Sequence, residues 1–168
     1  VSLQDAPDAN GRDFLEFCRG TAILLGLGSA AGPRIAHALQ QARRPTVIWL
    51  ELQECTGCVE SILRSADPSI GELILNIVSL DYSHTLMAAS GTAAEAALAS
   101  SMKANMGEYL LVVTGSVPLA EDGIYTTMGG RTAKDVLVEA AAGAKAVFAV
   151  GACAHWGSVQ AAKPNPTG

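Results

Sequence analysis

Three cysteines carry the chemistry that this sequence could perform. Cys55 and Cys58 form a Cys-x-x-Cys pair, and Cys153 lies far downstream in a stretch rich in glycine and alanine. The remaining cysteine, Cys18, lies near the start of the chain. A secreted scaffold held by disulfides would be shorter and richer in cysteine. The pattern therefore indicates metal or redox chemistry.

Three kinds of site are compatible with these cysteines. A thioredoxin-like dithiol needs only the Cys-x-x-Cys pair. A structural zinc site would use the three thiols with His155 as the fourth ligand. An iron–sulfur cluster needs thiolate ligands, normally four for a [4Fe–4S] cluster. The cluster is favoured over zinc and the dithiol because it uses all three cysteines. It also suits the nearby glycines, which let the backbone approach the cluster sulfurs: Gly57, Gly151 and Gly157.

Alternating strand and helix patterns predict the elements that position the cysteines. Strands are expected over residues 46–50, 73–80, 109–113 and 146–150. Helices are expected over residues 58–64, 92–103 and 132–142. Strands that alternate with helices and are apolar on both faces are typical of a parallel sheet covered on both sides. The sequence therefore predicts a doubly wound α/β domain.

The predicted fold gathers the reactive residues at one edge of the sheet. In doubly wound sheets, ligands bind outside the carboxyl ends of the strands. Cys55 and Cys58 follow the first predicted strand, and Cys153 follows the fourth. Gly115 and Ser116 follow the third. We therefore expect one site, built from residues that are far apart in the sequence.

Composition excludes several other classes of protein. Acidic residues outnumber basic ones by 16 to 11, and no basic stripe is present, so nucleic acid is not an expected partner. No G-x-G-x-x-G follows the first predicted strand, which argues against a dinucleotide site. The apolar fraction of 49% is enough for a packed core.

Residues 1–38 are predicted to be an export leader, and residues 39–168 the folded domain. Arg12 precedes an apolar run, residues 21–31, which is followed by the small-x-small sequence Ala36-His37-Ala38. This order resembles a twin-arginine signal cleaved after Ala38, although it contains a single arginine. The alternative is an amphipathic helix that docks on the domain. Export would place the domain in the periplasm or on the periplasmic face of the membrane.

The longest motif resembles a known family. Residues 54–61, ECTGCVES, resemble the E-C-T-G-C-x-E-S signature of the [NiFe] hydrogenase small subunit. Further matching segments are GSVP at 115–118, DGIY at 122–125, GACA at 151–154 and the stretch 157–168. SLDY at 79–82 and MAASG at 87–91 match as well, and the resemblance as a whole extends almost continuously over residues 44–168.

The resemblance implies a fold, a cofactor and two partners. It implies a flavodoxin-like domain, incomplete at its C-terminus, in which Cys55, Cys58 and Cys153 are three ligands of a proximal [4Fe–4S] cluster. The fourth ligand belongs to a later G-C-P motif, and further clusters belong to a C-terminal part beyond these residues. A large partner subunit would hold the nickel–iron centre for H2 oxidation or proton reduction. A cytochrome-type protein would accept or donate the electrons.

Residues around the cysteines disfavour two related families, the oxygen-tolerant hydrogenases and the cluster-bearing subunit of respiratory complex I. Oxygen-tolerant relatives have extra cysteines where this chain has Gly57 and Ser158, so the resemblance implies an ordinary cluster. The cluster-bearing subunit of respiratory complex I has adjacent cysteines where this chain has Cys-Thr-Gly-Cys. From a different class, a zinc- or dithiol-bearing α/β domain without hydrogenase activity is the alternative.

Other polar and aromatic residues near the cysteines have simpler interpretations. Glu54 and Glu60 are candidates for a proton relay, but solvated or interface carboxylates are the simpler expectation. His155 is expected to be a hydrogen-bonded core or interface histidine rather than a ligand. Trp49 and Trp156 are expected to be packing residues.

Overall fold

The computed structural model describes residues 16, 19–20, 22–23, 26–34 and 44–168, and the chain divides into two units, residues 1–43 and 44–168. In the first unit a 3-10 helix, η1, spans Ser29–Ala31. The predicted leader falls mainly on residues outside those described, so it stays a prediction. Within the described part, no helix has the length and apolar character needed to cross a bilayer.

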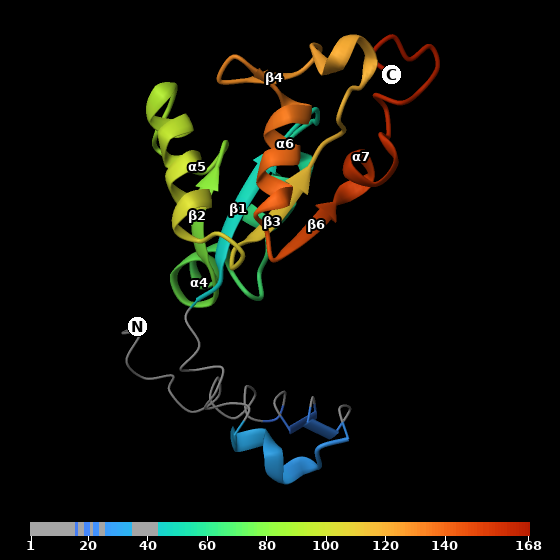
Figure 1. Ribbon diagram of the computed structural model, residues 1–168. Coiled ribbons are helices and arrows are strands. Elements are labelled where there is room, and N and C mark those ends of the chain that lie inside the picture. The colour runs from blue at the N-terminus through green and yellow to red at the C-terminus, as the bar shows by residue number, and fades with distance from the viewer. Residues whose placement is uncertain (1–15, 17–18, 21, 24–25, 35–43) are drawn as a thin grey trace. The chain divides into compact units, whose positions relative to one another are not determined.

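A four-stranded parallel sheet is the centre of the second unit (Figure 1). Its strands are β1 (Thr46–Glu51), β2 (Ser79–Ser83), β3 (Leu110–Thr114) and β6 (Ala146–Val150). They lie in the order β2-β1-β3-β6, and every neighbouring pair is parallel. This order matches the first four strands of the flavodoxin-like order 2-1-3-4-5. The prediction of a doubly wound α/β domain is confirmed.

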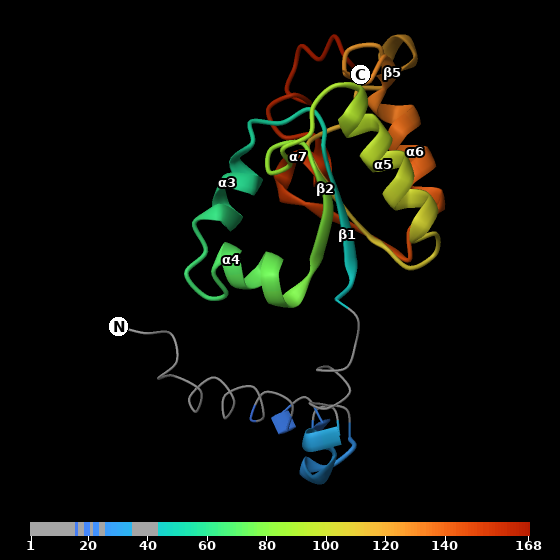
Figure 2. The same cartoon turned by 90° about the vertical axis from the view of Figure 1, so that its left-hand side faces the viewer.

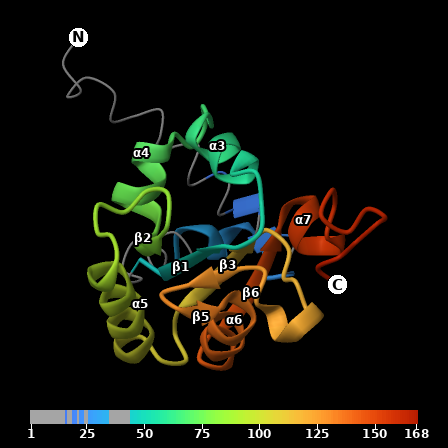
Figure 3. The same ribbon diagram turned by 90° about the horizontal axis from the view of Figure 1, so that it is seen from above.

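Helices cover both faces of this sheet. Figures 2 and 3 show α3 and α4 on one face and α5 and α6 on the other, with α7 beside the β6 edge. The helices are α3 (Gly57–Leu63), α4 (Ile70–Glu72), the π-helical turn η2 (Leu73–Ile77), α5 (Thr92–Ala104), the 3-10 turn η3 (Ala120–Gly123), α6 (Ala133–Ala142) and α7 (Gly151–Trp156). A small antiparallel hairpin, β4 (Thr127–Met128) and β5 (Arg131–Thr132), precedes α6.

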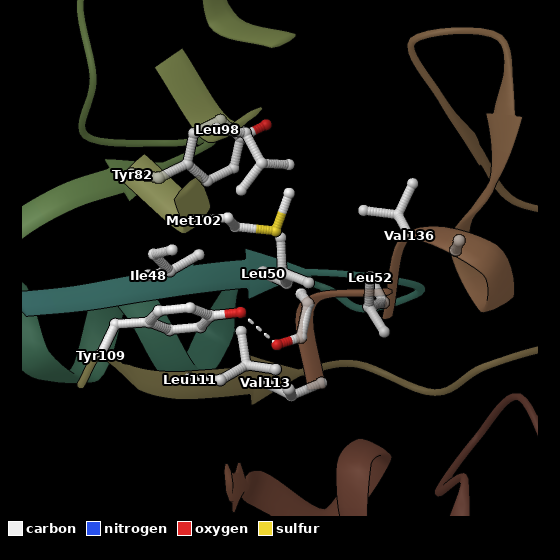
Figure 4. Close-up of a cluster of buried hydrophobic side chains, with 12 residues drawn as sticks. Ile48, Leu50, Leu52, Tyr82, Leu98, Met102, Tyr109, Leu111, Val113 and Val136 are labelled. Atoms are coloured by element: carbon white, nitrogen blue, oxygen red, sulfur yellow. Dashed lines mark hydrogen bonds between the residues drawn. The ribbon is translucent and has the colours of Figure 1, made fainter. Parts of the chain in front are cut away.

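The main core lies between the sheet and the pair α5 and α6 (Figure 4). Strand side chains meet helix side chains there: Ile48, Leu50, Tyr82, Leu111 and Val113 from the strands, and Leu98, Met102 and Val136 from the helices. Tyr109 is fully buried beside them, and its hydroxyl donates a hydrogen bond to the Ala140 carbonyl. A buried tyrosine needs such a partner, because an unpaired hydroxyl in the core would be costly.

The sequence makes β1 the central strand. Its run of β-branched, leucine and tryptophan side chains is buried on both faces, as expected for a strand with neighbours on either side. On the α3 face, the Trp49 indole N–H donates to the Thr114 Oγ1 at 3.1 Å, within the sheet. By contrast, Val147 and Phe148 of the edge strand β6 are each 49% exposed on opposite faces. Trp49 is therefore the packing residue that the sequence predicts.

The strand predicted over residues 73–80 is wrong in its first half. Residues 73–77 form η2, and β2 begins only at Ser79. The cause is a capping box just before the apolar run: the Glu72 N–H donates to Ser69 Oγ at 3.3 Å, and the Ser69 N–H donates to Glu72 Oε2 at 2.9 Å. These bonds start a helix, which the apolar run then continues. The Ser69 hydrogen bonds also lower the pKa of the Glu72 carboxyl.

Two valines of α6 test which face of this helix is held in the core. Val136 is 1% exposed and Val138 is 65% exposed. We expect Val136→Ala to lower the free energy of unfolding by about 2 kcal/mol, because it removes buried methyl groups and leaves a cavity. Val138→Ala removes the same atoms from the surface and should change the free energy of unfolding by about 0.5 kcal/mol or less. Urea unfolding followed by circular dichroism measures both; equal effects would contradict this packing.

Candidate metal centre

The structure places three cysteines at the carboxyl end of the sheet. Cys55 follows β1, Cys58 lies in the first turn of α3, and Cys153 lies in α7, directly after β6. All three are free thiols; Cys55 is exposed, and the other two are partly buried. The predicted location of the cysteines is therefore confirmed. Their role as cluster ligands stays a prediction.

Two glycines bring the backbone against two of the sulfurs. A Cβ atom added to Gly151 would lie 2.3 Å from Cys58 Sγ, and one added to Gly57 would lie 3.1 Å from Cys55 Sγ. Gly151 also has a φ of +85°, which disfavours any residue with a side chain. The close approach predicted from the sequence is found at these two positions. At Gly157 the neighbour is the Ala161 side chain, at 2.5 Å from an added Cβ, so that glycine serves packing.

Burial and negative charge act together on Cys58. Burial raises the pKa of the Cys58 thiol, and the charges of Glu54, Cys153 and Cys55 raise it further. Each of these three groups is therefore close enough to Cys58 to act on its thiolate. A positively charged centre bound among them would relieve this repulsion and favour the thiolates.

The thiols do not form a closed coordination set by themselves. Within the described residues, no three His, Cys, Asp or Glu side chains stand in an arrangement that could hold a metal ion. His155 is exposed and lies beside Trp156, with ring centroids 5.7 Å apart, rather than with the cysteines. This geometry gives no support to a zinc site that uses His155. The exposed ring of His155 shows that it is not a core residue, so the expectation of a core histidine is wrong, and that of an interface histidine stays a prediction.

A cavity adjoins the third cysteine. It has a volume of about 310 Å³, and Cys153, Ala154 and Gly157 line it together with Gly115 and Ser116 after β3. Trp156, in the same helix, points away from the core and is 71% exposed. The prediction that Trp156 is a packing residue is therefore wrong for this chain, because α7 lies at the sheet edge with only one side covered.

Glu54 differs from the sequence-based expectation. Both carboxylate oxygens are buried and have no hydrogen-bond partner within the described part of the chain. Burial raises the pKa of Glu54, the neighbouring Thr114 hydroxyl lowers it, and the charge of Glu51 raises it. A buried carboxylate without hydrogen-bond partners is costly, which is why burial is the largest cause of the raised pKa. The expectation of a solvated carboxylate is therefore wrong for Glu54, and the expectation of an interface carboxylate stays a prediction.

Glu60 matches the simpler expectation. Its side chain is half exposed and forms an ion pair with Arg64 one helical turn later, with 3.6 Å between the charged atoms. Such an exposed pair contributes little to stability. The geometry gives no support to a proton relay through Glu60.

Polar residues hold the loop before Cys55, and of these the sequence predicts Ser116 near the site but does not reveal Gln53 and Gln160. The Gln53 N–H donates to the Ser116 carbonyl at 3.2 Å, and the Ser116 N–H donates to the Gln53 carbonyl at 2.9 Å. Gln160 Nε2 also donates to the Gln53 carbonyl, at 2.9 Å. These bonds join the segments that follow β1, β3 and α7. The only sequence signal for Gln53 and Ser116 is that each lies just beyond a predicted strand, and Gln160 has none, because the sequence predicts no element after residue 150.

Comparisons with known proteins agree with this geometry. The sequence profile of the family described as "NADH ubiquinone oxidoreductase, 20 Kd subunit" matches residues 55–168. The chain is 52% identical to the uptake hydrogenase small subunit of Azotobacter vinelandii, over 93% of this chain and 44% of that protein. It is 49% identical to the periplasmic [NiFe] hydrogenase small subunit 1 of Nitratidesulfovibrio vulgaris, over 94% of this chain and 49% of that protein.

A solved structure shows the same fold. The recombinant [NiFeSe] hydrogenase from Desulfovibrio vulgaris Hildenborough matches with a TM-score of 0.71 and 36% sequence identity, over 77% of this chain and 47% of that chain. The resemblance to hydrogenase small subunits and the flavodoxin-like fold are thus confirmed. This chain spans less than half the length of these relatives.

Gly151 is the position where a single methyl group should disturb the site most. We expect Gly151→Ala to lower the free energy of unfolding by about 1–3 kcal/mol, because it strains the backbone and displaces Cys58 Sγ. Gly71 is the matched control, because an added Cβ there meets nothing within 4 Å. Gly71→Ala should be neutral or slightly stabilising. Urea unfolding measures both, and equal midpoints would contradict the contact.

Thiol alkylation of the cluster-free chain tests the raised pKa of Cys58. At neutral pH, iodoacetamide should modify the exposed Cys55 faster than Cys58, whose raised pKa leaves little thiolate. The rate at Cys58 should keep rising at pH values above the ordinary thiol pKa of about 8.5. Glu54→Gln removes one of the charges that raise the pKa of Cys58, so it should accelerate the alkylation of Cys58. Peptide mass spectrometry reads each site; equal rates at Cys55 and Cys58 at neutral pH would contradict this order.

Proposed function

This chain belongs to the NADH ubiquinone oxidoreductase 20 kDa subunit family, and we propose that it is the electron-relay part of a [NiFe] hydrogenase small subunit. One observation carries the proposal. Three free thiols from two distant segments lie at the carboxyl end of one sheet, near enough that the charges of Cys55 and Cys153 raise the pKa of Cys58, and glycines adjoin two of them. The names of its relatives, which are hydrogenase small subunits, point to the same role.

The residues present fit an iron–sulfur cluster. Thiolate sulfur is the ligand type that such clusters use, and Cys55, Cys58 and Cys153 would supply three of the usual four. A methyl group at Gly151 would occupy the space beside Cys58 Sγ, so this glycine keeps that sulfur close to the backbone. The negative charges that raise the pKa of Cys58 also favour a cationic occupant. The proposed fourth ligand belongs to the later G-C-P motif of the resemblance.

The protein's own residues would hold, shield and tune the cofactor. A bound [4Fe–4S] cluster supplies one-electron transfer. The two cysteines after β1 would bind it from one side of β3, and Cys153 would bind it from the other. Trp49 and Thr114, which are buried in the sheet and hydrogen-bonded to each other, would help to shield it from water. Backbone close to the sulfurs is one of the means by which a protein sets the potential of such a cluster.

The rest of the proposal concerns partners and location. A large hydrogenase subunit would hold the nickel–iron centre at which H2 is oxidised or protons are reduced, and this chain would pass single electrons between that centre and a cytochrome-type protein. Support comes from relatives that are small subunits, one of them periplasmic. We propose export to the periplasm through the twin-arginine-like leader over residues 1–38.

H2-dependent dye reduction tests this function. The chain assembled with its large subunit should reduce a viologen dye under H2, and the chain alone should not. Cys153→Ser in the complex should reduce this activity and the iron content together. Cys18→Ser is the matched control, because Cys18 lies in the predicted leader and should have no effect. Turnover by the chain alone, or full activity of Cys153→Ser, would contradict the proposal.

A further inference from the structure

The segment that leads to Cys55 is held differently on its two sides. On the β3 side, main-chain hydrogen bonds continue past the end of β1: the Leu52 N–H donates to the Thr114 carbonyl at 2.8 Å, and Gln53 pairs with Ser116. On the β2 side the pairing of strands ends earlier, at Trp49 and Ser83. Glu51, the last residue of β1, lies beyond that point.

Beyond the end of this pairing, the imidazole of His84 accepts the hydrogen bond that a β2 residue would otherwise accept. The Glu51 N–H donates to His84 Nδ1 at 3.2 Å. Because Nδ1 accepts, the proton of the neutral ring is on Nε2, which faces the Tyr82 hydroxyl at 3.2 Å. The two rings also pack edge to face, with centroids 5.1 Å apart. Tyr82 is only 2% exposed, so it anchors the ring from the core.

The side chain of Glu51 is held by the same segment. Its carboxylate accepts hydrogen bonds from Ser83 Oγ at 2.7 Å, from the Thr85 N–H at 3.0 Å and from the Thr85 hydroxyl. Residues 83–85 thus bind both the main chain and the side chain of Glu51. Desolvation lowers the pKa of His84, although the charges of Glu51 and Glu95 oppose this, and the neutral ring is the form that accepts at Nδ1.

We propose that His84 is a positioning residue for the cysteine site. By accepting the Glu51 N–H, it fixes the direction in which the chain leaves β1, and Cys55 follows four residues later. The inference rests on the proposed function, since it assumes that Cys55 is a ligand. Sites of this kind need their ligands held within about 0.5 Å, which requires support from residues that do not touch the cofactor.

Three variants of the assembled hydrogenase separate the two hydrogen bonds of the ring. His84→Asn keeps an acceptor near the position of Nδ1. His84→Gln keeps a polar atom near the position of Nε2, and His84→Ala keeps neither. The readouts are the electron paramagnetic resonance spectrum and midpoint potential of the reduced cluster, and hydrogen exchange of the peptide that contains Glu51.

The expected effects of the three variants depend on whether each keeps an acceptor for the Glu51 N–H. His84→Ala and His84→Gln should speed exchange at the Glu51 amide by about tenfold, the equivalent of one lost hydrogen bond. They should also alter the spectrum and potential of the cluster. His84→Asn should restore all three readouts.

Several results would overturn the inference. Faster exchange with an unchanged spectrum and potential would make His84 merely structural. If His84→Ala fails to fold, the other two variants decide, and equal spectra for Asn and Gln would overturn it. The proposed function fails separately, if the unsubstituted assembly contains no iron and no acid-labile sulfide.

Discussion

The pairing of β1 with β3, and of β3 with β6, is the constraint on which the site depends. Glu51 pairs with Thr114, and Thr114 pairs with Val150, so the last residues of three strands stand in one row across the sheet. The chain leaves this row toward the cysteines on either side of β3. A shift of one residue in either pairing would reverse the faces of the strand and separate the thiols.

At the carboxyl end of the sheet, close packing buries groups whose charged forms burial disfavours. Close packing brings the backbone of Gly151 against Cys58 Sγ and buries the carboxylate of Glu54. Burial in turn raises the pKa values of both groups. Without a cofactor, burial therefore works against the charged forms of both groups, and a bound cationic centre would oppose this effect at the thiols. A site that is unfavourable for charge when empty and favourable when occupied is consistent with the cluster that we propose.

The sequence predicts what depends on short patterns. Period and composition were sufficient for the parallel sheet, and the position of the cysteines after two strands was sufficient to place them together. The apolar run 73–80 carries no period that separates strand from helix, and only the Ser69–Glu72 capping box shows that it starts as a helix. The burial of Glu54 and the bond from Glu51 to His84 depend on which strands are neighbours, so no local pattern reveals them.

The metal content of the purified protein tests the central claim most directly. Iron and acid-labile sulfide should be present in about equal amounts, as a [4Fe–4S] cluster requires, when the protein is isolated without oxygen. Zinc should be absent from the site. Zinc alone, or thiols that bind neither iron nor sulfide in the assembled protein, would contradict the account and favour a structural or dithiol domain instead.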